Sequence, residues 1–267
     1  VLEGLELEYS GSNALSVPAN TTIMLTGSSN SVTAGSGTGL YAKGSLTILG
    51  GGSLNVTGGS YGITVASDPG PKTVTIKSGS LTATGRDYSG SGIGRSYGID
   101  ASVVLSGGTL TATGGNAITV ISNFAHSRGI TGSVTVTDGE LTATAGTVIG
   151  ADGSTSFGIG KGGSITGGIV NARGATQAIH RDSSLTIGSE ALPATIENAC
   201  NDFGFPFTES KGVVGTSLYG YDGEAYDPSQ MVIISFPAAK ELTPTATFTA
   251  TGPDRGTLSG VTDGMKY

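Results

Sequence analysis

Hydrophobic and small polar residues alternate along most of this chain in short segments, and the segments recur in a fixed order. In one copy the apolar positions are Val74 and Ile76 in a first segment and Leu81 and Ala83 in a second. The corresponding first segments begin at residues 46, 74, 103, 134, 165 and 185. Alternation with a period of two residues is typical of a β-strand with one buried face. The pattern therefore predicts short strands separated by glycine-rich turns.

A third segment completes each copy and contains an Ile with Gly or Ala beside it. We expect these isoleucines to face inward with the other apolar residues; they are Ile63, Ile93, Ile118 and Ile159. Three strands in each copy predict an all-β chain that folds as a right-handed parallel β-helix of about seven three-sided coils. A β-sandwich or an antiparallel barrel is the alternative, but neither requires the same three-part order to recur.

The repeat also divides the chain. We expect residues 1–20 to form an N-terminal cap, residues 21–190 to form the β-helix, and residues 191–240 to form an aromatic-rich C-terminal cap whose rings cover the last coil or bind a ligand. Residues 241–267 resemble the start of a small β-module that is truncated, so we expect further domains in the same protein.

Composition narrows the class of protein. Glycine is abundant, with 47 residues, and only 12% of residues are charged, which suits a repeat structure with tight corners better than a disordered chain. The net charge of −7 argues against a nucleic-acid partner, because phosphate binding needs clustered Lys and Arg. No apolar run is long enough for membrane insertion. A single cysteine, Cys200, forbids an intrachain disulfide, and the low charge and high Ser/Thr content favour an extracellular location.

Three versions of one motif carry a family resemblance: Gly-Ser-Leu-Thr-Ala-Thr-Gly at 79–85, Gly-Gly-Thr-Leu-Thr-Ala-Thr-Gly-Gly at 107–115 and Gly-Glu-Leu-Thr-Ala-Thr-Ala-Gly at 139–146. The region 20–190 resembles the glycine-rich repeats of cell-surface proteins from Gram-positive gut bacteria, which are described as adhesin-like or carbohydrate-binding-domain proteins. The resemblance implies a bacterial cell-surface location and a polysaccharide or host glycan as partner. It brings no catalytic motif that matches residues of this chain.

Enzymatic chemistry has weak support in the sequence. Glycoside hydrolysis needs two carboxyl groups about 5–10 Å apart, and Asp87, Asp100 and Asp152 are the acidic residues in the variable third segments that could share a face. Asp138-Gly139 occupies a turn position and is expected to be structural. His126, His180 and Cys200 lack metal-ligand spacing, so we predict no metal site. We also predict no cofactor and no catalytic residue.

One further motif recurs in the third segments. Tyr61, Tyr97 and Phe157 each follow a serine and precede Gly-Ile. Rings on successive coils could stack on sugars, but each ring lies two residues from the inward Ile, so a regular strand would place it inside or at the corner. We therefore favour a structural aromatic ladder over a sugar platform.

These observations lead us to expect a non-catalytic extracellular surface domain for adhesion or glycan contact, with Tyr61, Tyr97, Phe157, Asp87, Asp100 and Asp152 as candidate ligand-binding residues. The alternatives are a polysaccharide-active enzyme or acidic-glycan binder on a β-helix, and a structural spacer without a ligand.

Overall fold

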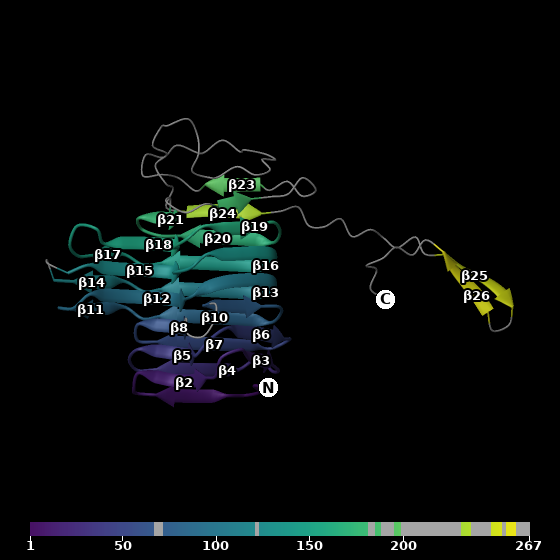
Figure 1. Ribbon diagram of the computed structural model, residues 1–267, viewed down its shortest axis with the longest axis horizontal. Coiled ribbons are helices and arrows are strands. Elements are labelled where there is room, and N and C mark those ends of the chain that lie inside the picture. The colour runs from purple at the N-terminus through teal and green to yellow at the C-terminus, as the bar shows by residue number, and fades with distance from the viewer. Residues whose placement is uncertain are drawn as a thin grey trace. The chain divides into compact units, whose positions relative to one another are not determined.

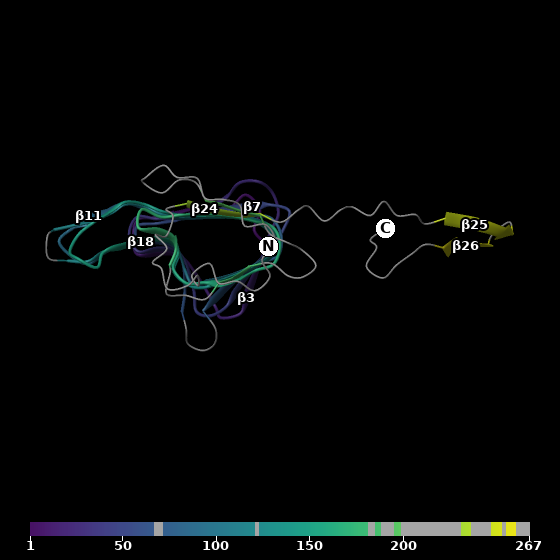
Figure 2. The ribbon, with the colours of Figure 1, turned by 90° about the horizontal axis from the view of Figure 1, so that it is seen from above.

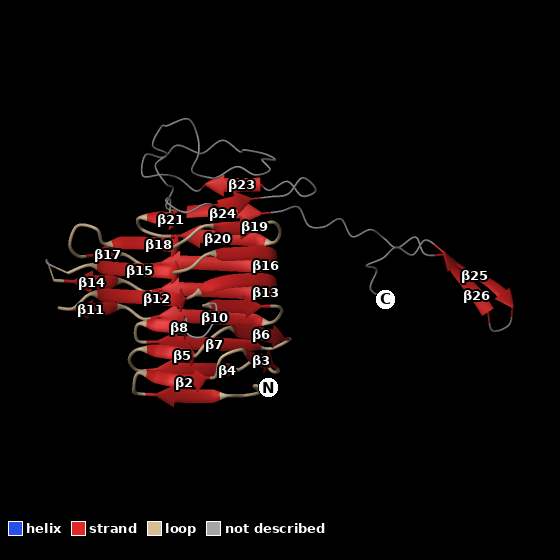
Figure 3. Cartoon of the chain, viewed as in Figure 1, coloured by secondary structure: helices blue, strands red, loops and turns tan. Residues whose placement is uncertain are grey.

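The computed structural model describes residues 1–66, 72–120 and 123–180, and the backbone of strands at 185–187, 195–198, 231–235, 247–252 and 255–259. The described residues form strands and turns and include no helix, which confirms the all-β prediction (Figure 3). Strands from successive copies lie side by side and pair in parallel, as in a parallel β-helix (Figure 1). The stack has about six turns, slightly fewer than predicted.

Two sides of each coil belong to one bent 14-stranded sheet. Its first ladder consists of β3 (Thr21–Leu25), β6 (Leu46–Gly50), β9 (Thr73–Ile76), the first parts of β13 (Ser102–Gly114) and β16 (Val134–Ala145), β19 (Gly163–Ile165) and β22 (Leu185–Ile187). Its second ladder consists of β1 (Glu6–Tyr9), β4 (Asn30–Ala34), β7 (Ser53–Gly58), β10 (Ser80–Gly85), the second parts of β13 and β16, and β20 (Ile169–Arg173).

The third side is a seven-stranded parallel sheet, which we call the third sheet. It contains β2 (Asn13–Val17), β5 (Thr38–Ala42), β8 (Tyr61–Val65), β12 (Gly94–Asp100), β15 (Ala125–Ile130), β18 (Thr155–Ile159) and β21 (Gln177–Ile179). The view along the stack shows the closed cross-section of the coils (Figure 2). The predicted three-sided coil is therefore present.

Three consecutive coils carry an extension between the second ladder and the third sheet. We call it the lobe; its described residues are 86–93, 115–120, 123–124 and 146–154. Its short strands β11 (Tyr88–Gly90), β14 (Ala117–Thr119) and β17 (Val148–Ile149) pair in parallel as a sheet of their own. In Figure 2 the lobe projects beyond the three-sided section at β11.

The core is made of identical or similar residues stacked in register. In the second ladder Leu81 is paired with Leu54 below it and Leu110 above it, and all three are buried. Burial of such apolar ladders is the main stabilising contribution in a repeat fold. One coil cannot enclose a core alone, so neighbouring coils must stack to bury these residues. Alternation thus places the predicted apolar positions inside.

The prediction for the third segments was correct for Ile63 and Ile159 but wrong for Ile93 and Ile118. Ile63 and Ile159 are fully buried, whereas Ile93 and Ile118 are 51% and 41% exposed. The reason is that the chain leaves the core at these two points to form the lobe. The inward isoleucines of the three lobed coils are Ile99, Ile130 and Ile159, which follow the lobe segments and align with Ile63.

Glycine turns join the first two ladders, as predicted. Gly108 and Gly139 have φ values of +77° and +90°, a region that side chains other than glycine rarely adopt. Asp138 accepts a hydrogen bond from the Gly139 amide at its Oδ1 (2.7 Å), which confirms its role as a turn residue. One boundary differs from the prediction by two residues: Val134 pairs with Gly163, so that first strand begins at Gly163 and not at position 165.

The two ends of the described stack differ in strand direction. Residues 1–20, which we expected to form a cap, contain β1 and β2, and these pair in parallel with β4 and β5 like the strands of later coils. At the other end β24 (Met231–Ser235) pairs antiparallel with both β20 and β23 (Thr195–Asn198). The parallel order therefore ends at β20 in the second ladder. The aromatic residues expected to form the rest of the C-terminal cap lie outside the described residues.

The chain consists of two compact units, residues 1–236 and residues 237–267. The second unit contains an antiparallel hairpin of β25 (Thr247–Gly252) and β26 (Arg255–Ser259). A strand was expected at Phe248–Ala250, and β25 covers it; the other segment expected there, residues 260–267, lies outside the described residues. Among the described residues there is no helix of the length and apolar character that a membrane crossing requires.

Candidate functional site

In β8, β12 and β18, the three strands that carry a predicted aromatic residue, a glycine follows the ring and decides which way the ring points. A Cβ on Gly98 would lie 2.5 Å from the Thr113 amide nitrogen and 2.8 Å from the Ala112 carbonyl carbon, so this position faces the second ladder across a very narrow core. Gly98 and Ile99 both face inward, which makes the strand irregular and leaves Tyr97 on the outer side. The strand is therefore not regular at this point, and the condition under which the rings were expected to lie inside is not met.

The three predicted aromatic residues lie in one row across the third sheet. Tyr61 pairs with Tyr97, Tyr97 with Arg128, and Arg128 with Phe157. The rings of Tyr61 and Tyr97 are 5.3 Å apart between centroids. The Arg128 guanidinium carbon lies 5.8 Å from the Tyr97 ring centroid and 5.6 Å from that of Phe157, within the range of a cation–π interaction. We call these four residues the aromatic–arginine row.

The members of this row differ in how far their side chains are buried. Tyr97 and Phe157 are only 8% and 4% exposed, so their ring faces are taken up by protein contacts. This agrees with a structural ladder at these two positions and leaves little ring surface for stacking on a sugar. Tyr61 and Arg128 are half-buried, so parts of both side chains reach solvent.

A second row on the same outer face contains more polar side chains. Arg95 pairs with His126, and His126 pairs with Thr155. His126 Nδ1 is 2.9 Å from Thr155 Oγ1. The Phe124 ring lies parallel to the His126 ring, with 6.2 Å between centroids and 9° between planes, and Phe124 is 46% exposed. Phe124 thus offers the accessible ring that Tyr97 and Phe157 do not.

The surroundings set the charge states on this face. Burial lowers the pKa of His126, and the nearby Arg128 and Arg95 lower it further, so the ring is favoured in its neutral form. Burial raises the pKa of Tyr97, against the opposite influence of Arg128 and Arg95. A hydrogen bond with the Tyr61 side chain raises the pKa of Arg95, which therefore stays charged. The positive charge on these two rows comes from the two arginines.

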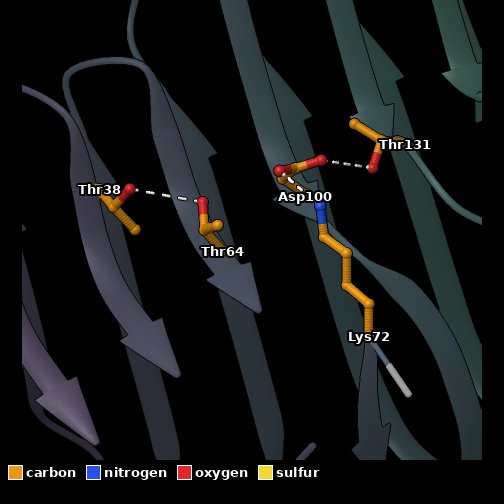
Figure 4. Close-up of polar contacts among 5 residues, drawn as sticks. All are labelled: Thr38, Thr64, Lys72, Asp100 and Thr131. Carbon is orange, nitrogen blue, oxygen red and sulfur yellow. Dashed lines mark hydrogen bonds and ion pairs between the residues drawn. The ribbon is translucent and has the colours of Figure 1, made fainter. Parts of the chain in front are cut away.

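Asp100, a predicted site residue, lies at the end of β12 and is already engaged. Its Oδ2 is 2.7 Å from Lys72 Nζ, and its Oδ1 accepts a hydrogen bond of 2.8 Å from Thr131 (Figure 4). On the neighbouring strands of the same sheet, the Thr38 and Thr64 hydroxyls are 3.4 Å apart. These contacts connect successive coils, so the role that the structure gives Asp100 is a structural one.

Asp87 and Asp152 lie on other parts of the coil. Asp87 stands where the chain enters the lobe, and it accepts hydrogen bonds of 2.7 and 3.2 Å from the backbone and side-chain nitrogens of Asn116 on the next coil. Asp152 is exposed in the turn between β17 and β18. The structure thus gives Asp87, Asp100 and Asp152 separate surroundings, and in the described ranges no group of three His, Cys, Asp or Glu side chains converges on a metal-sized site.

Buried serines close the neck of the lobe. Ser127 Oγ donates to the Gly115 carbonyl (2.7 Å) and accepts from the Gly146 amide (2.8 Å), and so joins the two ends of one lobe loop to the next coil. Ser96 and Ser156 make the equivalent pairs of bonds in their coils. These bonds give the backbone carbonyl and amide groups hydrogen-bond partners at the point where the chain leaves the core. Water is therefore not needed to pair these groups at the base of the lobe.

The outer surface of the lobe is unusually apolar. Five large hydrophobic residues that are more than 40% exposed belong to it: Ile93, Ile118, Val120, Phe124 and Ile149. Exposed apolar clusters beside polar groups are typical of interaction surfaces. Phe124 connects this cluster to the row of Arg95 and His126.

Sequence reasoning missed Arg95, Phe124, His126 and Arg128 as members of the site. A signal for Arg128 was present: Ser127-Arg128-Gly129-Ile130 has the same form as the three aromatic motifs, with Arg at the ring position.

In comparisons with known proteins, no family model, no curated protein and no solved structure matches this chain. The functional argument therefore depends on the geometry of this face.

Proposed function

We propose that this chain is a non-catalytic, glycan-contacting domain of an extracellular bacterial surface protein. The contact surface is the outer face of the third sheet next to the lobe. We call it the binding face and define it by Tyr61, Arg95, Phe124, His126 and Arg128. The remaining coils act as a rigid support that holds this face at a fixed spacing.

One observation carries the proposal: exposed aromatic and aliphatic side chains lie beside two arginines on a single rigid face. Phe124 is exposed and stacked on His126, and Arg95 and Arg128 follow on the same side of the sheet. Ligand sites combine apolar and aromatic surface with a few fixed polar groups. Sugars suit such a face, because their rings have apolar C–H sides and their hydroxyls exchange hydrogen bonds with Arg and His.

A glycan array tests the proposal. We expect the wild-type chain to bind a subset of glycans and Phe124→Ala to weaken that binding about tenfold, in line with the contribution of an aromatic contact. Tyr9→Ala, which removes another exposed ring from the first coil, is the matched control and should bind like the wild type. Absence of binding to every glycan at high micromolar concentration would contradict the proposal and favour the spacer.

A further inference from the structure

We infer that the binding face selects anionic glycans, and that Arg128 and Arg95 receive the carboxylate or sulfate group of the sugar. This inference rests on the proposed glycan contact and names its ligand class. It follows from the charges of the face, from the way Arg128 is held and from the state of the neighbouring groups.

The first argument concerns charge balance. The chain has a net charge of −7, yet Arg95 and Arg128 lie on neighbouring strands of one face. Where the chain is described, the one ion pair is Lys72–Asp100, so neither arginine has a carboxylate partner. The two guanidinium groups carry charge of the same sign, so an anion bound between them interacts favourably with both.

The second argument concerns Arg128 itself. Its guanidinium is held between the rings of Tyr97 and Phe157, at 5.8 and 5.6 Å from their centroids. Within the described part of the chain its Nε is buried without a hydrogen-bond partner. A guanidinium fixed by stacking loses little conformational freedom on binding, and its planar set of donors matches the oxygens of a carboxylate or sulfate.

The third argument concerns the groups around the arginines. Asp100 forms its ion pair with Lys72 and accepts a hydrogen bond from Thr131; its charge also favours the charged form of Arg95, but in the described residues it forms no ion pair with either arginine. His126 stacks on Phe124 and contacts Thr155, which positions an apolar and hydrogen-bonding surface beside Arg95 and Arg128. The arrangement fits a sugar ring on Phe124 and His126 whose acidic substituent reaches the arginines.

The test uses an array that contains neutral, carboxylated and sulfated glycans, followed by affinity measurements on the best binders. We expect the acidic glycans to bind, and we expect Arg95→Gln and Arg128→Gln each to weaken them about 10- to 100-fold, the effect of losing a hydrogen bond to a charged group. The carboxylated and sulfated arms identify which anion is preferred. Arg173→Gln, an exposed arginine on β20, is the matched control and should change nothing.

Each outcome has a separate meaning. If neutral glycans bind as well as acidic ones, or if both arginine variants bind like the wild type, the anionic preference is wrong and the glycan contact stands. If no glycan binds, the proposed function fails and the inference fails with it. Arg95 is exposed, so Arg95→Gln keeps the test valid even if Arg128→Gln unfolds, and Arg128→Lys, which keeps the charge without the planar fork, should recover only part of the affinity.

Discussion

The plain coils and the lobed coils of this protein differ at one corner. In a plain coil the chain crosses from the second ladder to the third sheet through residues 59–60, whereas in a lobed coil it uses a longer segment such as residues 146–154. The leucine ladder beneath is unchanged, since Leu54, Leu81 and Leu110 keep the same register across both kinds of coil. The comparison teaches that strand pairing fixes the core, while the corner can lengthen and carry function.

The lobed corner remains tight at its base because of two features. The neck serines bond the two ends of the loop to each other and to the next coil, as Ser127 does with Gly115 and Gly146. The glycines of the third sheet bring that sheet against the second ladder, as Gly98 does with Ala112 and Thr113. The binding face therefore projects from a closed core.

The largest expected effect is on folding stability, which a substitution in the core ladder should lower far more than one in the lobe. Leu110→Ala removes a fully packed side chain and should lower the free energy of unfolding by about 2–5 kcal/mol, because it leaves a cavity between coils. Ile118→Ala, on the exposed face of β14, should change it by less than about 0.5 kcal/mol. Urea denaturation followed by circular dichroism measures both. Similar costs for the two variants would contradict the separation of core and lobe.

The next largest effect on stability is expected where the third sheet lies close to the second ladder. Gly98→Ala should destabilise the protein by about 1–3 kcal/mol, since its Cβ would meet the backbone of Thr113, which cannot move aside without breaking the ladder. Gly51→Ala is the matched control, because a Cβ there has no heavy atom within 4 Å. A neutral Gly98→Ala would show that the coils are wider at this point than the structure indicates.

The neck serines should contribute less than the core but more than an exposed serine. Ser127→Ala leaves the Gly115 carbonyl and the Gly146 amide without their partner, at a cost of about 1–3 kcal/mol. Ser89→Ala, on an exposed position of β11, should have almost no effect. Hydrogen exchange at the Gly146 amide should accelerate in the first variant. Unchanged exchange would mean that the serine does not hold the neck.

The smallest effect concerns pH. The folded state lowers the pKa of His126 below its ordinary value of 6.5, through burial and then through Arg128 and Arg95. The unfolded chain therefore binds a proton at a pH where the folded chain does not, and this contribution to stability is lost as the pH falls below 6.5. The unfolding midpoint of His126→Gln should depend less on pH than that of the wild type between roughly pH 5 and 7. Equal slopes would contradict the assignment.

Much of the core was predictable because alternation records burial directly. Leu81 and Ala83 repeat at a fixed spacing with Thr between them, and the structure buries both. The lobe was not predictable in the same way. Ile93 and Ile118 have the same glycine or alanine neighbours as the inward isoleucines, and local pattern does not reveal that the chain has left the stack.

The candidate site was only partly predictable. The recurrent motif correctly grouped Tyr61, Tyr97 and Phe157 in one row, because equal spacing from the inward Ile fixes their register. It could not reveal that Gly98 faces inward and so turns the ring outward, since that depends on the distance between two sheets. Phe124 and His126 do not recur along the chain, so no repeat marked them.

The chain provides its own reporters for the binding face. His126 and His180 are its only two histidines. His126 stacks on Phe124, and the His180 ring lies 4.5 Å from Phe157, at the end of the aromatic–arginine row. Histidine ring signals in an NMR spectrum can therefore be followed without interference from other parts of the molecule.

The most direct measurement is an NMR titration of these rings with an acidic oligosaccharide that binds the chain. The account predicts that the His126 signals shift progressively and saturate at the affinity measured by calorimetry. Saturated binding that leaves the signals of His126 and His180 unchanged would place the ligand elsewhere and contradict the assignment of the binding face.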